Sequence, residues 1–164
     1  MRSLGIRCTS DAVYYAVVEA GDDGVVLVEK NKFQLAKSEL LGRNLANLSR
    51  DVVDAVRQLR VETVGIKLVE RQAFRTGGAK SGLVRRMHLE GALISALGAA
   101  GVPTTVGMSN ELARLAGSQS MKAYRNSDDF RGLDGYGNIR PEEAQEAAYV
   151  ALVALTIHSR EQAS

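Results

Sequence analysis

Residues 3–33 decide the fold, and they read SLGIRCTSDAVYYAVVEAGDDGVVLVEKNKF. This stretch holds three runs rich in apolar, β-branched and aromatic residues: Ser3 to Thr9, Ala12 to Ala20, and Val25 to Phe33. Such residues favour strands. Two turn signals separate the runs, first Ser10-Asp11 and then Gly21-Asp22-Asp23-Gly24, and the second is typical of a hairpin. We therefore predict an antiparallel meander of three strands.

The apolar pattern then changes its period. Leu41, Leu45, Leu48, Val52, Val56 and Leu59 recur at three- and four-residue steps, which predicts one face of an amphipathic helix. Thr63 to Val69 is a short β-rich run after that helix, and we expect a parallel strand at the sheet centre. Leu83 to Ala100 reads as a second helix, whose Gly91, Ala92, Ala96 and Gly98 suggest close approach to a neighbouring element.

The last third alternates short elements with an irregular stretch. We expect a strand from Val102 to Met108, then a short helix capped by Ser109 with Leu112 and Leu115 facing inward. Gly117 to Arg140 is polar with little periodicity, which indicates a surface loop. Pro141 suits the first turn of a final helix, and Ala147 to Ile157 is apolar nearly all round, so that helix should be buried. No linker or repeat divides residues 1–164, and we predict a single domain.

Composition limits the functions open to this chain. Its 164 residues are 45% hydrophobic and 24% charged, which is ordinary for a globular domain. The net charge of +2 means that nucleic-acid binding would have to depend on a local patch. A lone cysteine, Cys8, fits a small core residue in a reducing compartment. No run is long enough for a membrane span, and we expect a cytoplasmic protein.

Several motifs in order resemble RuvC-like Holliday junction resolvases, which have a ribonuclease H-like fold. Leu4-Gly5-Ile6-Arg7 and Tyr14-Tyr15-Ala16-Val17-Val18 resemble the family's first two strands, and Val64-Gly65-Ile66-Lys67 resembles its fourth. Glu70 to Leu97 and Pro141 to Leu155 resemble the following loop and helix and the last helix. The layout is also similar to an uncharacterised bacterial domain family with Lys on the fourth strand. The resemblance implies an α/β fold with a mixed five-stranded sheet flanked by helices.

The resemblance also implies where catalytic carboxylates would lie. Two divalent ions about 4 Å apart activate water and stabilise the leaving oxygen in such nucleases, and hard cations need oxygen ligands. By position, the acids of the first and fourth strands fall on Arg7 and Lys67, and those of the last helix fall on Glu143 and Glu146. Two of the four positions are therefore basic. We infer a degenerate site in which Arg7 and Lys67 pair with Glu143 and Glu146 in place of metal ions.

Simpler explanations stand beside this hypothesis. Glu142, Glu143 and Glu146 could be a solvated helix start that complements the helix dipole. Lys67 and Arg7 could lie at exposed strand ends or a sheet edge.

A basic segment follows the fourth predicted strand. Between Lys67 and Glu90 the chain has six basic residues and two acidic ones. Arg71, Arg75, Lys80, Arg85 and Arg86 are candidates for contacting nucleic-acid phosphates, with Gly77-Gly78 allowing close backbone approach and Lys122 and Arg125 extending the patch. The alternative is a solvated helix face, in which Arg86 and Glu90 form an ordinary surface pair.

We therefore predict a non-catalytic, RuvC-like protein that binds DNA or RNA, or a protein partner, with no cofactor. The first alternative is a metal-dependent nuclease that uses Mg²⁺ or Mn²⁺ and relocated acids, namely Asp11, Glu70, Asp128, Asp129 or Asp134. The second is a homodimeric scaffold that assembles through the last helix or through Leu83 to Ala100. Neither Cys/His metal spacing nor a phosphate-binding glycine loop is present.

Overall fold

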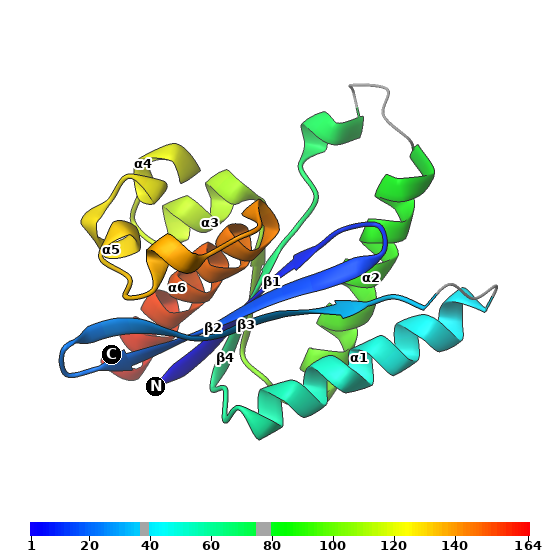
Figure 1. The fold of residues 1–164 in the computed structure, drawn as a ribbon, viewed down its shortest axis with the longest axis horizontal. Helices are drawn as coiled ribbons and strands as arrows, with labels where there is room; N and C mark the ends of the chain where they lie inside the picture. The colour runs from blue at the N-terminus through cyan, green and yellow to red at the C-terminus, as the bar shows by residue number, and fades with distance from the viewer. Residues whose placement is uncertain (37–39, 75–79) are drawn as a thin grey trace.

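The predicted meander is confirmed in the computed structural model, which describes residues 1–36, 40–74 and 80–164 (Figure 1). Its strands are β1 (Arg2–Cys8), β2 (Ala12–Gly21) and β3 (Gly24–Gln34). Each pairs antiparallel with the next. The hairpin sequence at residues 21–24 joins β2 to β3 because its glycines tolerate the turn, and Gly24 has a φ of 122°.

Two parallel strands complete a five-stranded sheet in the order β3-β2-β1-β4-β5. β4 (Thr63–Lys67) runs parallel to both β1 and β5 (Thr104–Gly107), as predicted for β4. Its expected place at the sheet centre is wrong, because β1 is the middle strand. All of β4 is nevertheless buried, since helices cover both faces of the sheet there.

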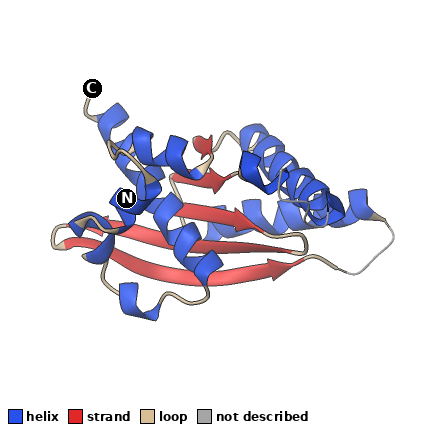
Figure 2. Ribbon diagram, turned by 90° about the horizontal axis from the view of Figure 1, so that it is seen from above, coloured by secondary structure: helices blue, strands red, loops and turns tan. Residues whose placement is uncertain are grey.

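Helices lie on both faces of the sheet (Figure 2). One face packs against α1 (Leu41–Gln58) and α2 (Lys80–Ala99), in a core that contains Leu4, Ile6 and the predicted apolar face of α1. The other face packs against α6 (Glu142–Gln162). The remaining helical segments are η1 (Arg71–Phe74), α3 (Ser109–Leu115), α4 (Met121–Arg125), α5 (Asp128–Arg131) and η2 (Tyr136–Asn138). None of the described helices is long and apolar enough to cross a membrane.

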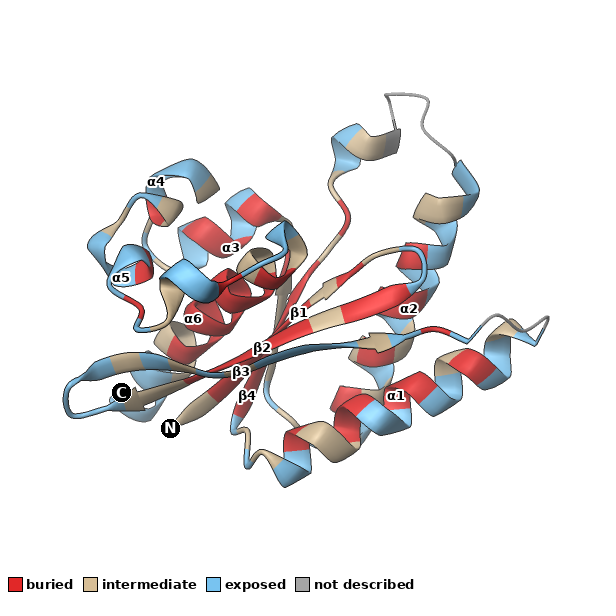
Figure 3. Cartoon of the chain, in the orientation of Figure 1, coloured by how far each residue is buried: buried red, intermediate tan, exposed pale blue. Residues whose placement is uncertain are grey.

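Two glycines let α6 lie directly on the strands. Gly5 and Gly65 are register partners on β1 and β4. A Cβ at Gly5 would overlap the backbone of Ala147 and Ala151, and one at Gly65 would lie 2.5 Å from the carbonyl oxygen of Val150. The predicted burial of α6 is confirmed, and its middle turns are inaccessible (Figure 3).

The small residues of α2 divide between two environments, because Ala96 packs against the core and the two glycines do not. A Cβ at Gly91 or Gly98 would meet nothing within 4 Å, so their expected close approach to another element is wrong. α6 is also unsuited to the dimer contact considered above, because β1, β2, β4 and α3 already cover it.

Residues 117–140 are more ordered than the surface loop that we predicted. Tyr124, Phe130 and Ile139 are buried against α6, and the rings of Tyr124 and Tyr149 meet edge to face with centroids 4.9 Å apart. Just before this segment, Leu112 of α3 is buried as expected. The inward orientation predicted for Leu115 is wrong, since that side chain is 49% exposed.

Candidate functional site

A cluster of charged side chains lies where β1 and β4 end beneath the start of α6. Arg7 and Lys67 are register partners on these parallel strands. Nε of Arg7 lies 2.5 Å from Oε2 of Glu146, and Nζ of Lys67 lies 2.9 Å from Oε1 of the same carboxylate. Glu146 therefore bridges two cations, and the exposed strand ends considered as an alternative are excluded because Lys67 is 4% exposed.

Arg125 brings a third cation to Glu146 from α4. Its guanidinium nitrogens lie 3.6 Å from Glu146 Oε1 and 3.8 Å from Glu142 Oε1. Its Nε and one terminal nitrogen are buried without a hydrogen-bond partner in the described part of the chain. The sequence predicts Arg125 in a basic patch and gives no sign of its place beside Glu146, because no apolar periodicity marks α4.

Glu70 joins the loop after β4 to the start of α3. Its carboxylate accepts hydrogen bonds from the Ser109 hydroxyl and, at 3.0 Å, from the Ser109 backbone N–H. It also lies 3.9 Å from Nζ of Lys67. Ser109 was predicted to cap α3, but Met108 holds that position and Ser109 is the first helical residue. The serine anchors Glu70 instead.

Glu143 lies apart from the cluster, contrary to the pairing that we predicted. It is half-buried and forms no ion pair with any described residue. Glu142 and Glu146, one helical turn apart, both reach Arg125. The predicted pairing of Glu143 was wrong because the side of α6 that faces the cations depends on how the helix lies on the sheet, which the sequence spacing does not show.

The excess of cations around Glu146 shifts proton affinities in the cluster. Burial raises the pKa of the Glu146 carboxyl, but the hydrogen bonds and charges of Lys67 and Arg7 outweigh it and hold the pKa below its ordinary value. Burial also lowers the pKa of Lys67, and Arg7 adds to this although Glu146 opposes it. Glu146 is therefore ionised at neutral pH and serves as the counter-charge of the cluster.

Lys67, Arg125 and Glu146 of the cluster line a depression of about 550 Å³, and the formal charges of its lining, which does not include Arg7, balance. Lys67, Arg71 and Arg125 are opposed there by Glu70, Glu142 and Glu146. No three His, Cys, Asp or Glu side chains of the described residues are grouped as metal ligands would be. Both oxygens of Glu146 already contact cations, whereas Mg²⁺ requires several free oxygen ligands. The residues present do not fit the two-metal centre that the resemblance implies.

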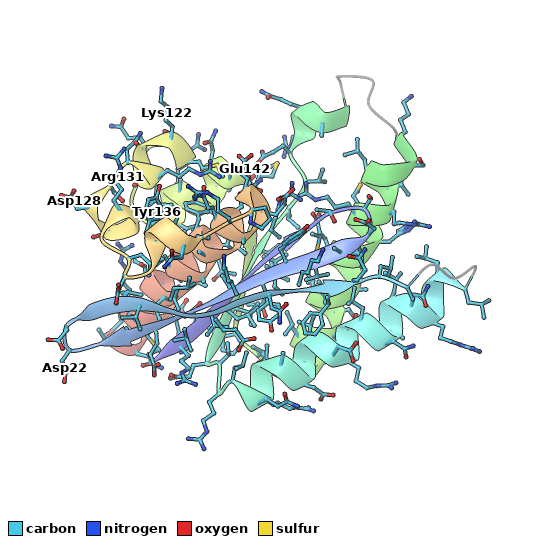
Figure 4. All side chains as sticks on the ribbon, in the orientation of Figure 1. Asp22, Lys122, Asp128, Arg131, Tyr136 and Glu142 are labelled. Atoms are coloured by element: carbon cyan, nitrogen blue, oxygen red, sulfur yellow. The ribbon has the colours of Figure 1, made fainter. Side chains whose placement is uncertain are left out.

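The acids proposed for the alternative nuclease do not form a second centre. Asp11, Asp128, Asp129 and Asp134 are exposed. Asp128 projects from α5, apart from Glu142 at the start of α6 (Figure 4). Of this group, Glu70 alone lines the depression among the described residues.

The basic segment divides into exposed and buried cations. Arg71, Lys80 and Arg85 are exposed, and Arg75 and Gly77-Gly78 lie outside the described residues. Arg86 is buried, with Nε 2.6 Å from Oε1 of Glu90, and Glu90 also accepts the backbone N–H of Val69 at 3.1 Å. The surface pair considered for Arg86 and Glu90 is therefore wrong, because spacing at i and i+4 does not reveal which side of a helix is covered.

Solved structures show the same arrangement of strands and helices. RuvC from Thermus thermophilus matches with a TM-score of 0.75 and 16% identity, covering 98% of this chain and 97% of that one.

The chain has the RuvC fold.

A second RuvC structure, described as a T. thermophilus complex with Holliday junction substrate, matches with a TM-score of 0.70 and 16% identity, covering 98% of this chain and 96% of that one. The yeast mitochondrial Holliday junction resolvase matches with a TM-score of 0.61 and 14% identity, covering 98% and 80%. No protein-family model matches the sequence, and no curated protein does. These matches confirm the predicted ribonuclease H-like, RuvC-like architecture with its mixed five-stranded sheet.

Proposed function

We propose that this protein binds nucleic acid and does not cleave it. One observation carries the second half of this proposal: Arg7 and Lys67 both contact Glu146 where the RuvC resemblance implies acidic metal ligands. Arginine does not deprotonate in proteins, so Arg7 repels a divalent ion at any ordinary pH. A cation triad around one carboxylate replaces the charge that metal ions would supply.

The binding half of the proposal is supported by the fold and by exposed cations on the segment that follows β4. RuvC of the same fold is described in complex with a Holliday junction substrate. In this chain Arg71 lies on the rim of the depression, and Lys80 and Arg85 are exposed on the first turns of α2. Cations that contact phosphates release counterions and give salt-dependent affinity.

The test measures binding and cleavage in the same samples. Fluorescence anisotropy would follow labelled single-stranded DNA, single-stranded RNA and a four-way DNA junction between about 50 and 200 mM salt. We expect affinity to fall as salt rises, and we expect Arg71→Ala and Arg85→Ala each to reduce the salt slope by about one. Arg57→Ala, which removes an exposed arginine from the C-terminal end of α1, is the matched control.

Two outcomes separate the halves of the proposal. Failure to bind any of the three probes at low salt contradicts nucleic-acid binding and favours a protein partner. Cleavage with Mg²⁺ or Mn²⁺ that disappears in a Glu146→Gln variant whose circular dichroism shows that it is folded contradicts the non-catalytic role and favours the nuclease alternative.

A further inference from the structure

A row of opposed residues crosses four strands near the start of α6. Arg7 pairs in register with Lys67 on β4 and with Tyr14 on β2, and Tyr14 pairs with Lys32 on β3. Directly opposed residues share one face of a sheet. Because Arg7 and Lys67 contact α6, Tyr14 and Lys32 lie on the α6 face as well. The row therefore links the charged cluster to the β3 edge of the sheet.

The β3 end of the row is a second hollow, of about 210 Å³, which we call the edge hollow. Its lining includes Tyr14, Lys30, Lys32, Arg140, Pro141 and Ala144. Lys30, Lys32 and Arg140 are cations, and no carboxylate of the described residues lines it. The edge hollow therefore carries net positive charge, whereas the depression around Glu146 is balanced. The charge of the edge hollow attracts an anion.

Contacts within the protein hold these cations in place. Nζ of Lys30 donates to the carbonyl oxygens of Asn138 and Arg140, at 2.5 and 3.0 Å, and a lysine ammonium has a third N–H to offer. Nζ of Lys32 lies 5.8 Å from the centroid of the Tyr14 ring, a cation–π contact that restrains the side chain. The segment before α6 is thereby tied to β3, with donors left over for a ligand.

Size and lining define the ligand. Pockets that enclose a whole small molecule measure about 300–1,000 Å³, so the edge hollow takes a charged group and part of its carrier. Lysine and arginine are suited to phosphate oxygens, and Tyr14, Pro141 and Ala144 offer apolar surface to a sugar or base. We propose that the edge hollow binds the phosphate of a nucleotide unit in a nucleic-acid strand. This assignment rests on the proposed function for the strand.

The experiment titrates the full chain with inorganic phosphate, thymidine monophosphate and thymidine, followed by amide NMR shifts. Phosphate and the monophosphate are expected to shift the amides of Tyr14, Lys32 and Ala144, and thymidine is not. Lys32→Ala is expected to weaken monophosphate binding about tenfold, through the loss of one charge-assisted contact. Arg57→Ala removes an exposed cation of α1 that lies outside the edge hollow, and it should bind as the parent does.

An equal response to thymidine, no response to the monophosphate, or unchanged affinity in Lys32→Ala overturns the edge hollow as a phosphate site. The same variants are then titrated with the single-stranded DNA probe. If the monophosphate binds and DNA does not, the strand assignment is overturned and a free nucleotide is the ligand. If DNA binds equally to parent and Lys32→Ala, the proposed function stands and the edge hollow is excluded from it.

Discussion

The guanidinium of Arg7 lies 2.5 Å from the carboxylate of Glu146, a residue 139 positions later in the chain. The contact joins the middle strand of the sheet to the last helix. Lys67, from β4, contacts the other oxygen of the same carboxylate. Three elements that are distant in sequence therefore share one counter-charge.

Glu146→Ala should destabilise the fold by about 3–5 kcal/mol, because two buried or partly buried cations lose their carboxylate. Urea unfolding followed by circular dichroism measures the change. Glu143→Ala is the matched control on the same helix, and it should stay within about 0.5 kcal/mol of the parent. Equal effects of the two substitutions would contradict the role assigned to Glu146.

The stability of the protein should fall in acid because of Glu146. Its pKa in the folded state is held below the ordinary 4.5 by Lys67 and Arg7, against the opposing effect of burial. The contribution is therefore fully present above the unfolded pKa and is lost as the pH falls through the folded value. Unfolding free energy measured from pH 7 downward should decline less steeply below about pH 4.5 in Glu146→Gln than in the parent. Parallel profiles would show that Glu146 is not responsible.

Restoring acids should create a metal site that the parent lacks. The double variant Arg7→Asp with Lys67→Glu has carboxylates at both substituted positions beside Glu146, which makes three in all. Mn²⁺ should therefore raise the melting temperature of this variant. A ligand present at a hundred times its Kd adds about 2.7 kcal/mol to stability. The parent and a Lys122→Glu control should not respond. A parent protein stabilised by micromolar Mn²⁺ would contradict the inference that side-chain cations have replaced the ions.

Gly65→Ala should cost about 3 kcal/mol or more, because the new methyl group would overlap Val150 and push α6 away from β4. The comparison is Gly91→Ala on α2, where the added Cβ meets nothing. That substitution should stabilise the protein by about 0.5–1 kcal/mol through helix propensity. Thermal or urea unfolding gives both values, and a neutral Gly65→Ala would show that α6 does not need the glycine.

Self-association remains a proposal, and α2 is the helix available for it. Val84 and Met87 on α2 are each 47% exposed. Light scattering with size exclusion should give a dimer for the parent and a monomer for Val84→Glu. Val28→Glu changes another exposed valine, on β3, and should leave the dimer intact. A monomeric parent at high concentration would exclude the homodimeric scaffold.

Local patterns sufficed for most of the fold. Local sequence predicts the hairpin at Gly21 to Gly24 and the helix α1 with its periodic leucines and valines. Both elements depend mainly on residues that are neighbours in sequence. Glu146 was placed at the site by motif order alone. Glu143 was misplaced because the facing side of a helix depends on how the helix lies on the sheet.

The remaining features depend on contacts that the sequence does not display. Arg125 reaches Glu146 from a short helix that packs through Tyr124, and nothing near Arg125 in sequence signals that position. Gly5 and Gly65 matter because they are register partners beneath α6, which becomes visible when the strands are paired. Burial of the Arg86–Glu90 pair likewise follows from tertiary packing.

The close packing of α6 on Gly5 and Gly65 has a consequence for a chain that lacks this helix. Without residues 142–162, the α6 face of β1 and β4 is uncovered at Gly5 and Gly65. Arg7 and Lys67 also lose Glu146, the carboxylate that both contact. Such a chain lacks the helix that completes the second core. The packing of α6 thus completes the fold, and a chain that ends before Glu142 should not reach the native state.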